Sequence, residues 1–299
     1  MRLQAISAFL GISSDWSSRK GETKVPEIDH EALVALAAGA HPDDIEFMMA
    51  GTLLMLRNAG ARIHMWSVSD GSLGSVDKSR EATAKIRLAE ARASADAAGA
   101  EFHGPVAPDM GISCGPDMVA RAAAVIRSVR PRIILVHSPG DYHPDHENSC
   151  RLVVAAAFVR GFQDYRTVPD MPPWDGEVTI YHALPYGLLD GLRRRVAAGQ
   201  YVNTAEVMGE KRRLLEMHHS QLEWLRESLD LDYLEGMELM SSEVGRASGR
   251  FNHSEGWRRH LHLGFSRTDS DPLSEALGPL CWTDPAYEES LAPGDRPPR

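Results

Sequence analysis

The chain has 299 residues, of which 43% are hydrophobic and 25% are charged, and its formal net charge is −10. Such a chain is long enough for one large globular domain or two modest ones, and its negative charge argues against nucleic acid or an anionic membrane as a partner. Three widely spaced cysteines without a CxxC pair indicate neither a disulfide framework nor a thiolate zinc site. The first twenty residues lack the apolar core of a signal peptide, and no apolar run approaches the roughly 20 residues of a membrane span. We therefore expect a cytoplasmic chain.

Strand and helix patterns alternate along most of the sequence. Short strands are expected at 32–40, 61–70, 101–107, 132–138 and 177–185. Helices are expected at 43–60, 79–99, 116–130, 143–161 and 204–229. The helix at 79–99 is clearly bounded, because Ser79 suits an N-cap and Gly99 suits a helix end. This order predicts an α/β fold, a Rossmann-like three-layer sandwich with a mostly parallel sheet and helices on both faces.

The composition changes at both ends of this pattern. Residues 1–30 are mixed and polar and are expected to form an N-terminal arm. Residues 31–265 are expected to form the main domain. Residues 266–299 are rich in Pro, Asp, Glu and Ser, and we expect them to form a surface-lying or partly disordered tail.

Two histidine motifs stand at predicted strand-to-helix junctions. His41 and Asp44 form H-x-x-D in "AGAHPDDIEF", and His143 and His146 form H-x-x-H in "DYHPDH". Either motif alone is weak, since a chain with 13 histidines contains one by chance roughly once. Both motifs, however, follow strands of one parallel sheet, whose carboxyl ends share the edge where ligands bind. Each also contains a proline, which stiffens the turn and starts a helix well. The pair therefore predicts one shared site.

Imidazole and carboxylate donors suit zinc, and a catalytic zinc ion keeps three protein ligands and an open position for water. The expected ligands are His41, Asp44 and His146. Asp43 then lies beside the metal, where it can take a proton from water. His143 can stabilise an oxyanion, and Asp145 can orient that histidine. The same donors also suit ferrous iron.

A simpler interpretation of the first motif is also open. A lone histidine at a strand end is more often a satisfied polar residue than a ligand. Asp43 and Asp44 could merely favour a helix N-terminus, an effect worth ~0.3–1 kcal/mol each.

The stretch "AHPDDIEF", followed by "AGTL" and about a hundred residues later by "HPDH", resembles the LmbE/PIG-L family of zinc-dependent N-acetylglucosaminyl deacetylases. The stretches "SDGSLGS", "KIRLAEARASADAAGA" and "EKRRLLEMHHSQ" extend the resemblance over roughly residues 33–225. The resemblance implies the same site: zinc on His41, Asp44 and His146, Asp43 as the general base, and His143 backed by Asp145 at the oxyanion or leaving amine.

Two departures from the family pattern leave the substrate open. Many members have "GERG" after the second strand, with an arginine that contacts substrate, whereas residues 71–74 here read Gly-Ser-Leu-Gly. Where the family often has "VDIT", residues 201–204 read Tyr-Val-Asn-Thr.

Several further residues are candidates for substrate contact or support. The substrate-binding candidates are Glu46, Asp70, Ser72 and Tyr142. His218 occupies the histidine of the family's H-x-S-Q and is expected to pack rather than to reach the site. A solvated face or ion pairs are expected for Arg87, Glu90 and Arg92.

These residues predict a metal-dependent hydrolase that removes the acetyl group from an N-acetylated amino sugar or sugar conjugate. The alternatives are an amidase for a non-sugar acyl amide or thiol conjugate, and, more remotely, a non-catalytic Rossmann-like binding protein. No G-x-G-x-x-G follows the first strand, and the sequence contains no P-loop. The expected partner is a small N-acetylated sugar, without nucleic acid or membrane, and assembly into a homo-oligomer is left open.

Overall fold

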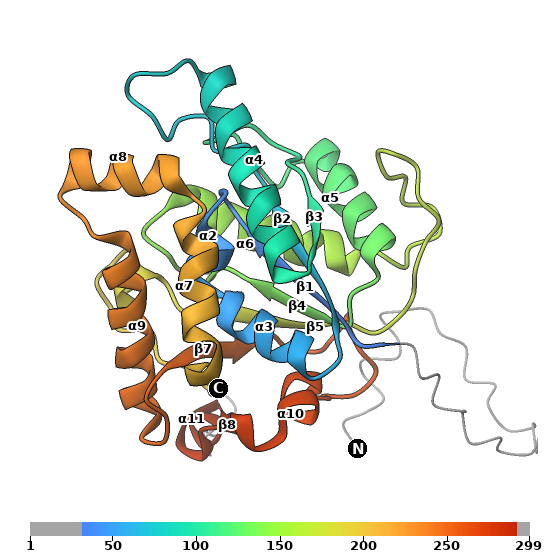
Figure 1. Ribbon diagram of the computed structural model, residues 1–299. Helices are drawn as coiled ribbons and strands as arrows, with labels where there is room; N and C mark the ends of the chain where they lie inside the picture. Colours follow the sequence, from blue (N-terminus) through green and yellow to red (C-terminus); the bar gives the residue numbers. More distant parts are fainter. Residues whose placement is uncertain (1–31, 292–299) are drawn as a thin grey trace, which may run out of the picture. The chain divides into compact units, whose positions relative to one another are not determined.

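The structure is a computed structural model that describes residues 32–291. The expected arm at 1–30 and the last eight residues lie outside the described part. Eight strands form one sheet in the order β3-β2-β1-β4-β5-β7-β6-β8, and helices pack on both of its faces (Figure 1). The strands are β1 (Val34–Gly39), β2 (Arg62–Ser67), β3 (Glu101–His103), β4 (Ile133–Val136), β5 (Thr179–Ala183), β6 (Gln200–Asn203), β7 (Ser254–Arg259) and β8 (Cys281–Thr283).

The first five strands are parallel to one another, and β7, β6 and β8 extend the sheet with antiparallel pairs. This arrangement confirms the predicted α/β class with a mostly parallel sheet. All six residues of β1 are buried, because a central parallel strand is covered on both faces. Leu36 packs into one core cluster, whereas Ala35 and Ala37 pack into the other.

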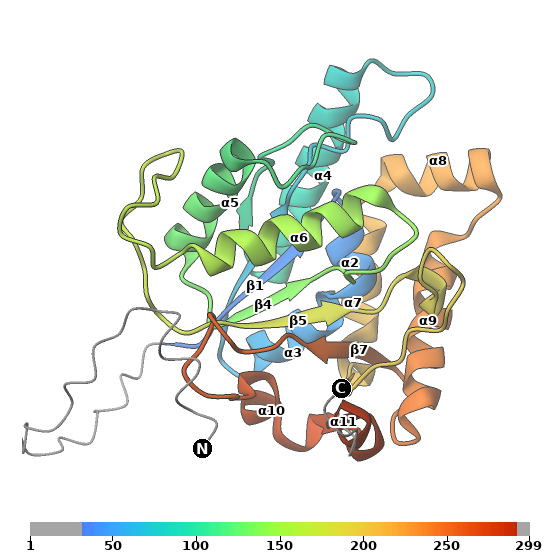
Figure 2. The ribbon, with the colours of Figure 1, turned by 180° about the vertical axis from the view of Figure 1, so that it is seen from behind.

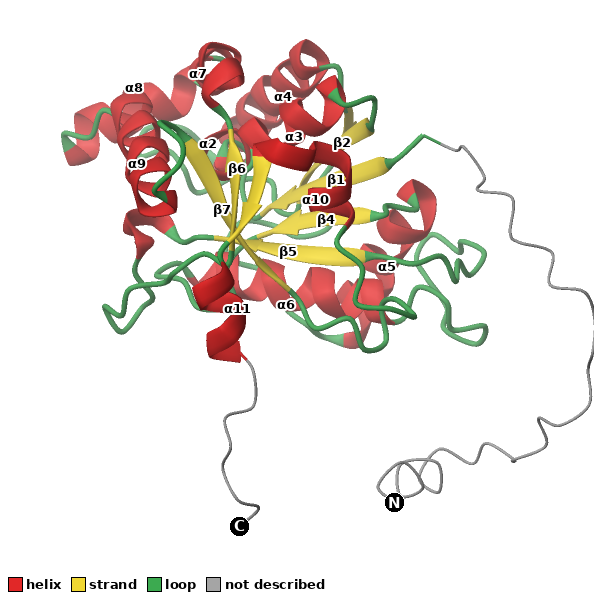
Figure 3. Cartoon of the chain, turned by 90° about the horizontal axis from the view of Figure 1, so that it is seen from below, coloured by secondary structure: helices red, strands yellow, loops and turns green. Residues whose placement is uncertain are grey.

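The helices form the two outer layers. Helices α5 and α6 cover one face, and α3, α4 and α7 cover the other, as the views from behind and from below show (Figures 2 and 3). No helix within residues 32–291 is long and apolar enough to cross a bilayer. The helices are α2 (Asp44–Met48), α3 (Ala50–Asn58), α4 (Arg80–Ala98), α5 (Pro116–Val129), α6 (Pro144–Phe158), α7 (Met208–Glu216), α8 (His219–Leu229), α9 (Tyr233–Ser248), α10 (Pro272–Leu277) and α11 (Pro285–Leu291).

Helix α4 has the ends that the sequence predicts. The Ser79 hydroxyl accepts the N–H of Ala82 at 3.2 Å, which satisfies one of the free donors of the first turn. Gly99 ends the helix with φ 72°, a left-handed conformation that glycine adopts without strain.

Two predicted helices are each divided in the structure. The expected helix at 43–60 becomes α2 and α3, which meet at Met49 with φ −131°. The expected helix at 204–229 becomes a short 3-10 turn followed by α7 and α8, with a break at His218. Neither break contains glycine or proline, so local sequence gives no signal for it.

The region beyond residue 265 is not a tail over its described length. Helix α10 contributes buried Leu273 and Leu277 to a core cluster. Strand β8 pairs with β6 and forms one edge of the sheet. Ordered structure therefore continues past the predicted boundary at 265. The segment beyond it is polar in overall composition, but a few of its apolar side chains pack into the core.

Candidate active site

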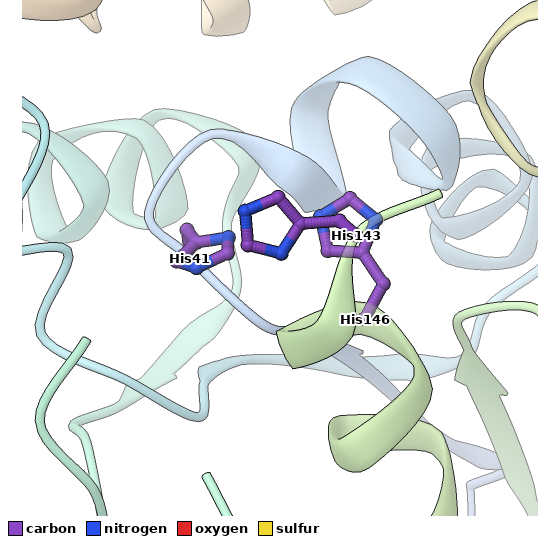
Figure 4. A group of neighbouring side chains, drawn as sticks. All are labelled: His41, His143 and His146. Atoms are coloured by element: carbon purple, nitrogen blue, oxygen red, sulfur yellow. The ribbon is translucent and has the colours of Figure 1, made fainter. Parts of the chain in front are cut away.

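The two histidine motifs meet at the carboxyl ends of β1 and β4, which are neighbouring strands in the sheet. His41 lies two residues beyond β1, and His143 and His146 lie at the start of α6. The ring of His41 is 4.8 Å from the ring of His143 and 5.6 Å from that of His146, centroid to centroid (Figure 4). Segments a hundred residues apart thus form one cluster.

Asp44 lies between two of these histidines. Its Oδ2 is 3.3 Å from Nδ1 of His41, and its Oδ1 is 3.3 Å from Nε2 of His146. Donors that share one tetrahedral zinc ion, each roughly 2.0–2.2 Å from it, lie about 3.3–3.5 Å from one another. Each of these two distances is thus close to the spacing between neighbouring ligands of a single divalent ion.

The second ring nitrogen of each of these histidines faces a carboxylate. Nε2 of His41 is 3.4 Å from Asp109 and 3.5 Å from Asp145, and Nδ1 of His146 is 3.1 Å from Asp141. Histidines that bind metals commonly donate their other N–H to such a group, which fixes the ring. Burial lowers the pKa of His146, but the surrounding carboxylates outweigh burial and raise it to about 9. The site is thus built to attract positive charge.

His143 is fixed by the backbone of its own helix. It is the N-cap of α6, and its Nδ1 accepts the N–H of Asp145 at 3.2 Å. Burial lowers the pKa of His143, so the ring is neutral near pH 7 and its proton lies on Nε2. The carboxylate of Asp145 contacts His41 and the N–H of Met110 instead. The expectation that this carboxylate orients His143 is corrected: the backbone of Asp145 does so, because the first turn of α6 points the side chain toward His41.

Asp43 has a strained backbone and a buried partner. Its φ is 109°, which is rare outside glycine and is found where function fixes an unfavourable conformation. Nη2 of Arg87 lies 3.2 Å from Oδ2 of Asp43 and also donates to the carbonyl of Pro42 at 2.7 Å. Burial raises the pKa of Asp43 to about 6, although Arg87 opposes that rise. A carboxylate with such a pKa is a suitable general base near neutral pH.

Arg87 is therefore not on a solvated face; it forms a buried ion pair. Glu90 and Arg92, for which a solvated face or ion pairs were also expected, make different contacts. Glu90 accepts from the backbone N–H and the hydroxyl of Ser220 at the start of α8. The guanidinium of exposed Arg92 lies over the ring of Phe102, 5.0 Å from its centroid.

Glu46 and His218 form a buried pair. Nε2 of His218 is 3.1 Å from Oε1 of Glu46. Burial lowers the pKa of His218, but Glu46 and Asp43 outweigh burial and raise it. Glu46 is thus engaged by a histidine, and fully buried His218 packs against it. The break between α7 and α8 places it there.

A cavity of about 350 Å³ opens over the cluster. Tyr142, a predicted substrate contact, lines it. Asp70 and Ser72, which were expected to contact substrate, do not line this cavity, and their side chains bond to neighbouring parts of the chain. Oδ1 of Asp70 accepts the N–H groups of Ser72 and Asp109, and the Ser72 hydroxyl accepts from Arg80.

Sequence reasoning missed His137, Asp109 and Asp141. The ring of His137 stacks on that of His146 at 4.0 Å, and its Nε2 accepts the N–H of Ala40. His137 directly follows β4, so the signal that marks His41 also marks it. Asp109 and Asp141 lie in loops, where no periodic pattern identifies them.

Comparison with known proteins finds a family whose model matches the part of the chain that carries this cluster. Residues 36–157, which include both histidine motifs, match the family model PIG-L, described as GlcNAc-PI de-N-acetylase. This part of the chain is similar to the PIG-L (LmbE) family. The matched part runs from β1 to the end of α6 and so contains the whole histidine cluster.

Similar curated proteins are deacetylases of N-acetylated sugars. Diacetylchitobiose deacetylase from Thermococcus kodakarensis is 26% identical over 209 residues, which are 68% of this chain and 75% of that protein. A 1D-myo-inositol 2-acetamido-2-deoxy-alpha-D-glucopyranoside deacetylase from Segniliparus rotundus is 32% identical over 162 residues. That match covers 43% of this chain and 51% of the relative, so the chain spans about half of that protein's length.

Solved structures share the fold. N,N'-diacetylchitobiose deacetylase from Pyrococcus horikoshii has a TM-score of 0.66 and 20% identity, over 81% of this chain and 89% of that one. The 4-carboxy-2-hydroxymuconate hydratase from Pseudomonas putida has a TM-score of 0.63 and 19% identity, over 80% of this chain and 99% of that one. Because a hydratase has the same fold, the reaction must be argued from the site.

Proposed function

We propose that this protein is a metal-dependent N-deacetylase that hydrolyses the acetamido group of an N-acetylated amino sugar or sugar conjugate. One observation carries the proposal: Asp44 lies 3.3 Å from a nitrogen of both His41 and His146, and Asp43 stands next to it with its pKa raised to about 6. Metal ligands beside a buried carboxylate base are the parts that hydrolysis of an amide requires.

Zinc is the ion we propose for the site, with ferrous iron as the alternative that the same donors accept. A divalent ion on His41, Asp44 and His146 would polarise the amide carbonyl and lower the pKa of water. The three cysteines are free thiols in the structure, and we place the protein in the reducing cytoplasm on that ground.

The side chains divide the reaction between them. Asp43 takes a proton from the attacking water, whose oxygen bonds to the amide carbon. The Nε2–H of His143 donates to the oxyanion that forms there. The C–N bond then breaks as the proton held by Asp43 passes to the leaving nitrogen, which gives acetate and a free amine. Arg87 holds Asp43 in place through these steps.

The test is hydrolysis of the methyl β-glycoside of N-acetylglucosamine by the zinc-loaded protein, with acetate and free amine both measured. Equal amounts of the two products are expected. Hydrolysis of non-sugar acyl amides alone would favour the amidase alternative, and addition of water to an unsaturated acid without release of amine would favour a hydratase. Absence of any turnover in zinc- and iron-loaded protein would contradict the proposal.

A further inference from the structure

Apolar side chains surround the mouth of the cavity above the histidine cluster. Four large apolar side chains that line the cavity are exposed, with fractional exposures of 45% for Leu73, 54% for Met110, 58% for Tyr142 and 63% for Leu229. We call these four residues the apolar rim. Exposed apolar groups that gather around a cavity mark a binding surface more often than groups scattered singly.

The rim comes from four separate segments of the chain. Leu73 lies in the loop after β2, Met110 in the loop after β3, Tyr142 just before α6, and Leu229 at the end of α8. Side chains from four segments meet at one cavity only through the tertiary fold, so no single local pattern produces the rim.

Two members of the rim are held by the carboxylates that also face His41. Asp109 accepts the N–H of Leu73 at 2.9 Å, and Asp145 accepts the N–H of Met110 at 2.8 Å. The same two carboxylates lie 3.4 and 3.5 Å from Nε2 of His41. These two members of the rim are therefore fixed relative to the catalytic cluster.

Met110 also has a strained backbone. Its φ is 59°, in the left-handed region that residues other than glycine, asparagine and aspartate rarely adopt. The bond to Asp145 maintains this conformation, which holds an exposed apolar side chain over the cavity. Strain of this kind persists where the surrounding structure enforces it.

Polar and apolar groups are separated within the cavity. The charged residues Asp43, Asp44 and Arg87 that line it are buried, whereas the rim at its mouth is exposed. Hydroxyl groups of a ligand that extended past the rim would lose water and gain no side-chain partner from Leu73, Met110 or Leu229. An alkyl or aryl group there would instead bury surface against them.

We propose that the substrate is an N-acetylated amino sugar with an apolar aglycone, an alkyl or aryl group that lies against the rim while the acetamide reaches the histidine cluster. This inference rests on the proposed deacetylase function. Within the rim, Leu73 presents a hydrocarbon side chain to the cavity from the loop at 71–74.

The test compares methyl and octyl β-glycosides of N-acetylglucosamine, which share the acetamide and differ only in the alkyl chain. We expect kcat/KM to be at least about tenfold higher for the octyl glycoside, the effect of burying about two methylene groups. Leu229→Ser and Leu73→Ser should each lower that ratio severalfold. Leu239→Ser is the matched control, because Leu239 is 60% exposed on α9 and does not line this cavity.

A ratio within twofold of one, or an equal fall of the ratio in Leu239→Ser, would overturn the inference. If neither glycoside is hydrolysed, the deacetylase proposal fails, and calorimetric binding of the two glycosides still tests the rim by the same expected preference. A dimer that dissociates in Leu229→Ser, together with no preference for octyl, would instead assign the rim to a second copy of the chain.

Discussion

Nη2 of Arg87 lies 3.2 Å from Oδ2 of Asp43, and both side chains are buried. The same guanidinium donates to the carbonyls of Pro42 and Gly71. Helix α4 is thereby tied to the strained turn that presents the base. The catalytic geometry at the end of β1 depends on a residue of the neighbouring helix as well as on its own motif.

Replacing Arg87 with methionine should lower kcat/KM by about 10- to 100-fold, because Asp43 loses the group that positions it. The metal content should stay unchanged, since Arg87 contacts no predicted ligand. Arg92→Met is the matched control on the same helix and should leave activity within about twofold. Equal effects of the two variants on kcat/KM would contradict the positioning role.

Removal of the carboxylate behind a ligand should weaken metal binding without abolishing it. Asp141→Asn loses the charge 3.1 Å from Nδ1 of His146, and we expect the metal affinity to fall about 10- to 100-fold. His146→Ala should lose the metal altogether. Competition with a chelator measures both, and an unchanged affinity in Asp141→Asn would argue against this support.

The oxyanion role of His143 predicts a loss in kcat. His143→Phe keeps a ring of similar shape but removes the Nε2–H, so kcat should fall about 100- to 1,000-fold. The metal content should be retained, because His143 is not among the three proposed ligands. Turnover close to that of the unmodified protein would exclude His143 as the donor.

Acid should destabilise the fold through His182, which lies in β5 away from the cavity. Burial, together with nearby His260 and Arg258, lowers its pKa to about 4 against the raising effect of the His137 carbonyl. The unfolded chain therefore binds the proton first, and the stabilising contribution of the neutral ring is lost as pH falls from about 6.5 toward 4.

Between pH 7 and pH 5 this loss amounts to about 2 kcal/mol of unfolding free energy. Urea unfolding of chelator-treated protein measures it. In His182→Gln, the fall in stability between these pH values should be smaller by that amount. In the control, His219→Gln at an exposed position, the fall should be unchanged. An identical pH dependence in His182→Gln and the unmodified protein would contradict the assignment.

Much of the fold and half of the site are readable in the sequence because they follow from local rules. Buried parallel strands show as continuous apolar runs, and the caps Ser79 and Gly99 bound α4. The two H-P-D turns share the sheet edge because parallel strands end together.

The remaining features depend on long-range packing. Arg87 stands near Glu90 and Arg92 on α4, so its spacing resembles that of a solvated face. Only the approach of the β1 turn buries it. His218 reaches Glu46 through a helix break that no glycine or proline marks. Strands β6 and β8 are short and pair across large sequence separations, which periodicity cannot detect.

The most direct test of the account measures metal content and acetate release on one preparation of Asp43→Asn. Asparagine keeps the size of the side chain but cannot accept the proton, and Asp44, His41 and His146 remain to hold the metal. We predict the same metal equivalents as in the unmodified protein and a kcat/KM at least about 100-fold lower on the methyl glycoside of N-acetylglucosamine. Full activity in Asp43→Asn, or a loss of activity explained by loss of the metal, would contradict Asp43 as the base.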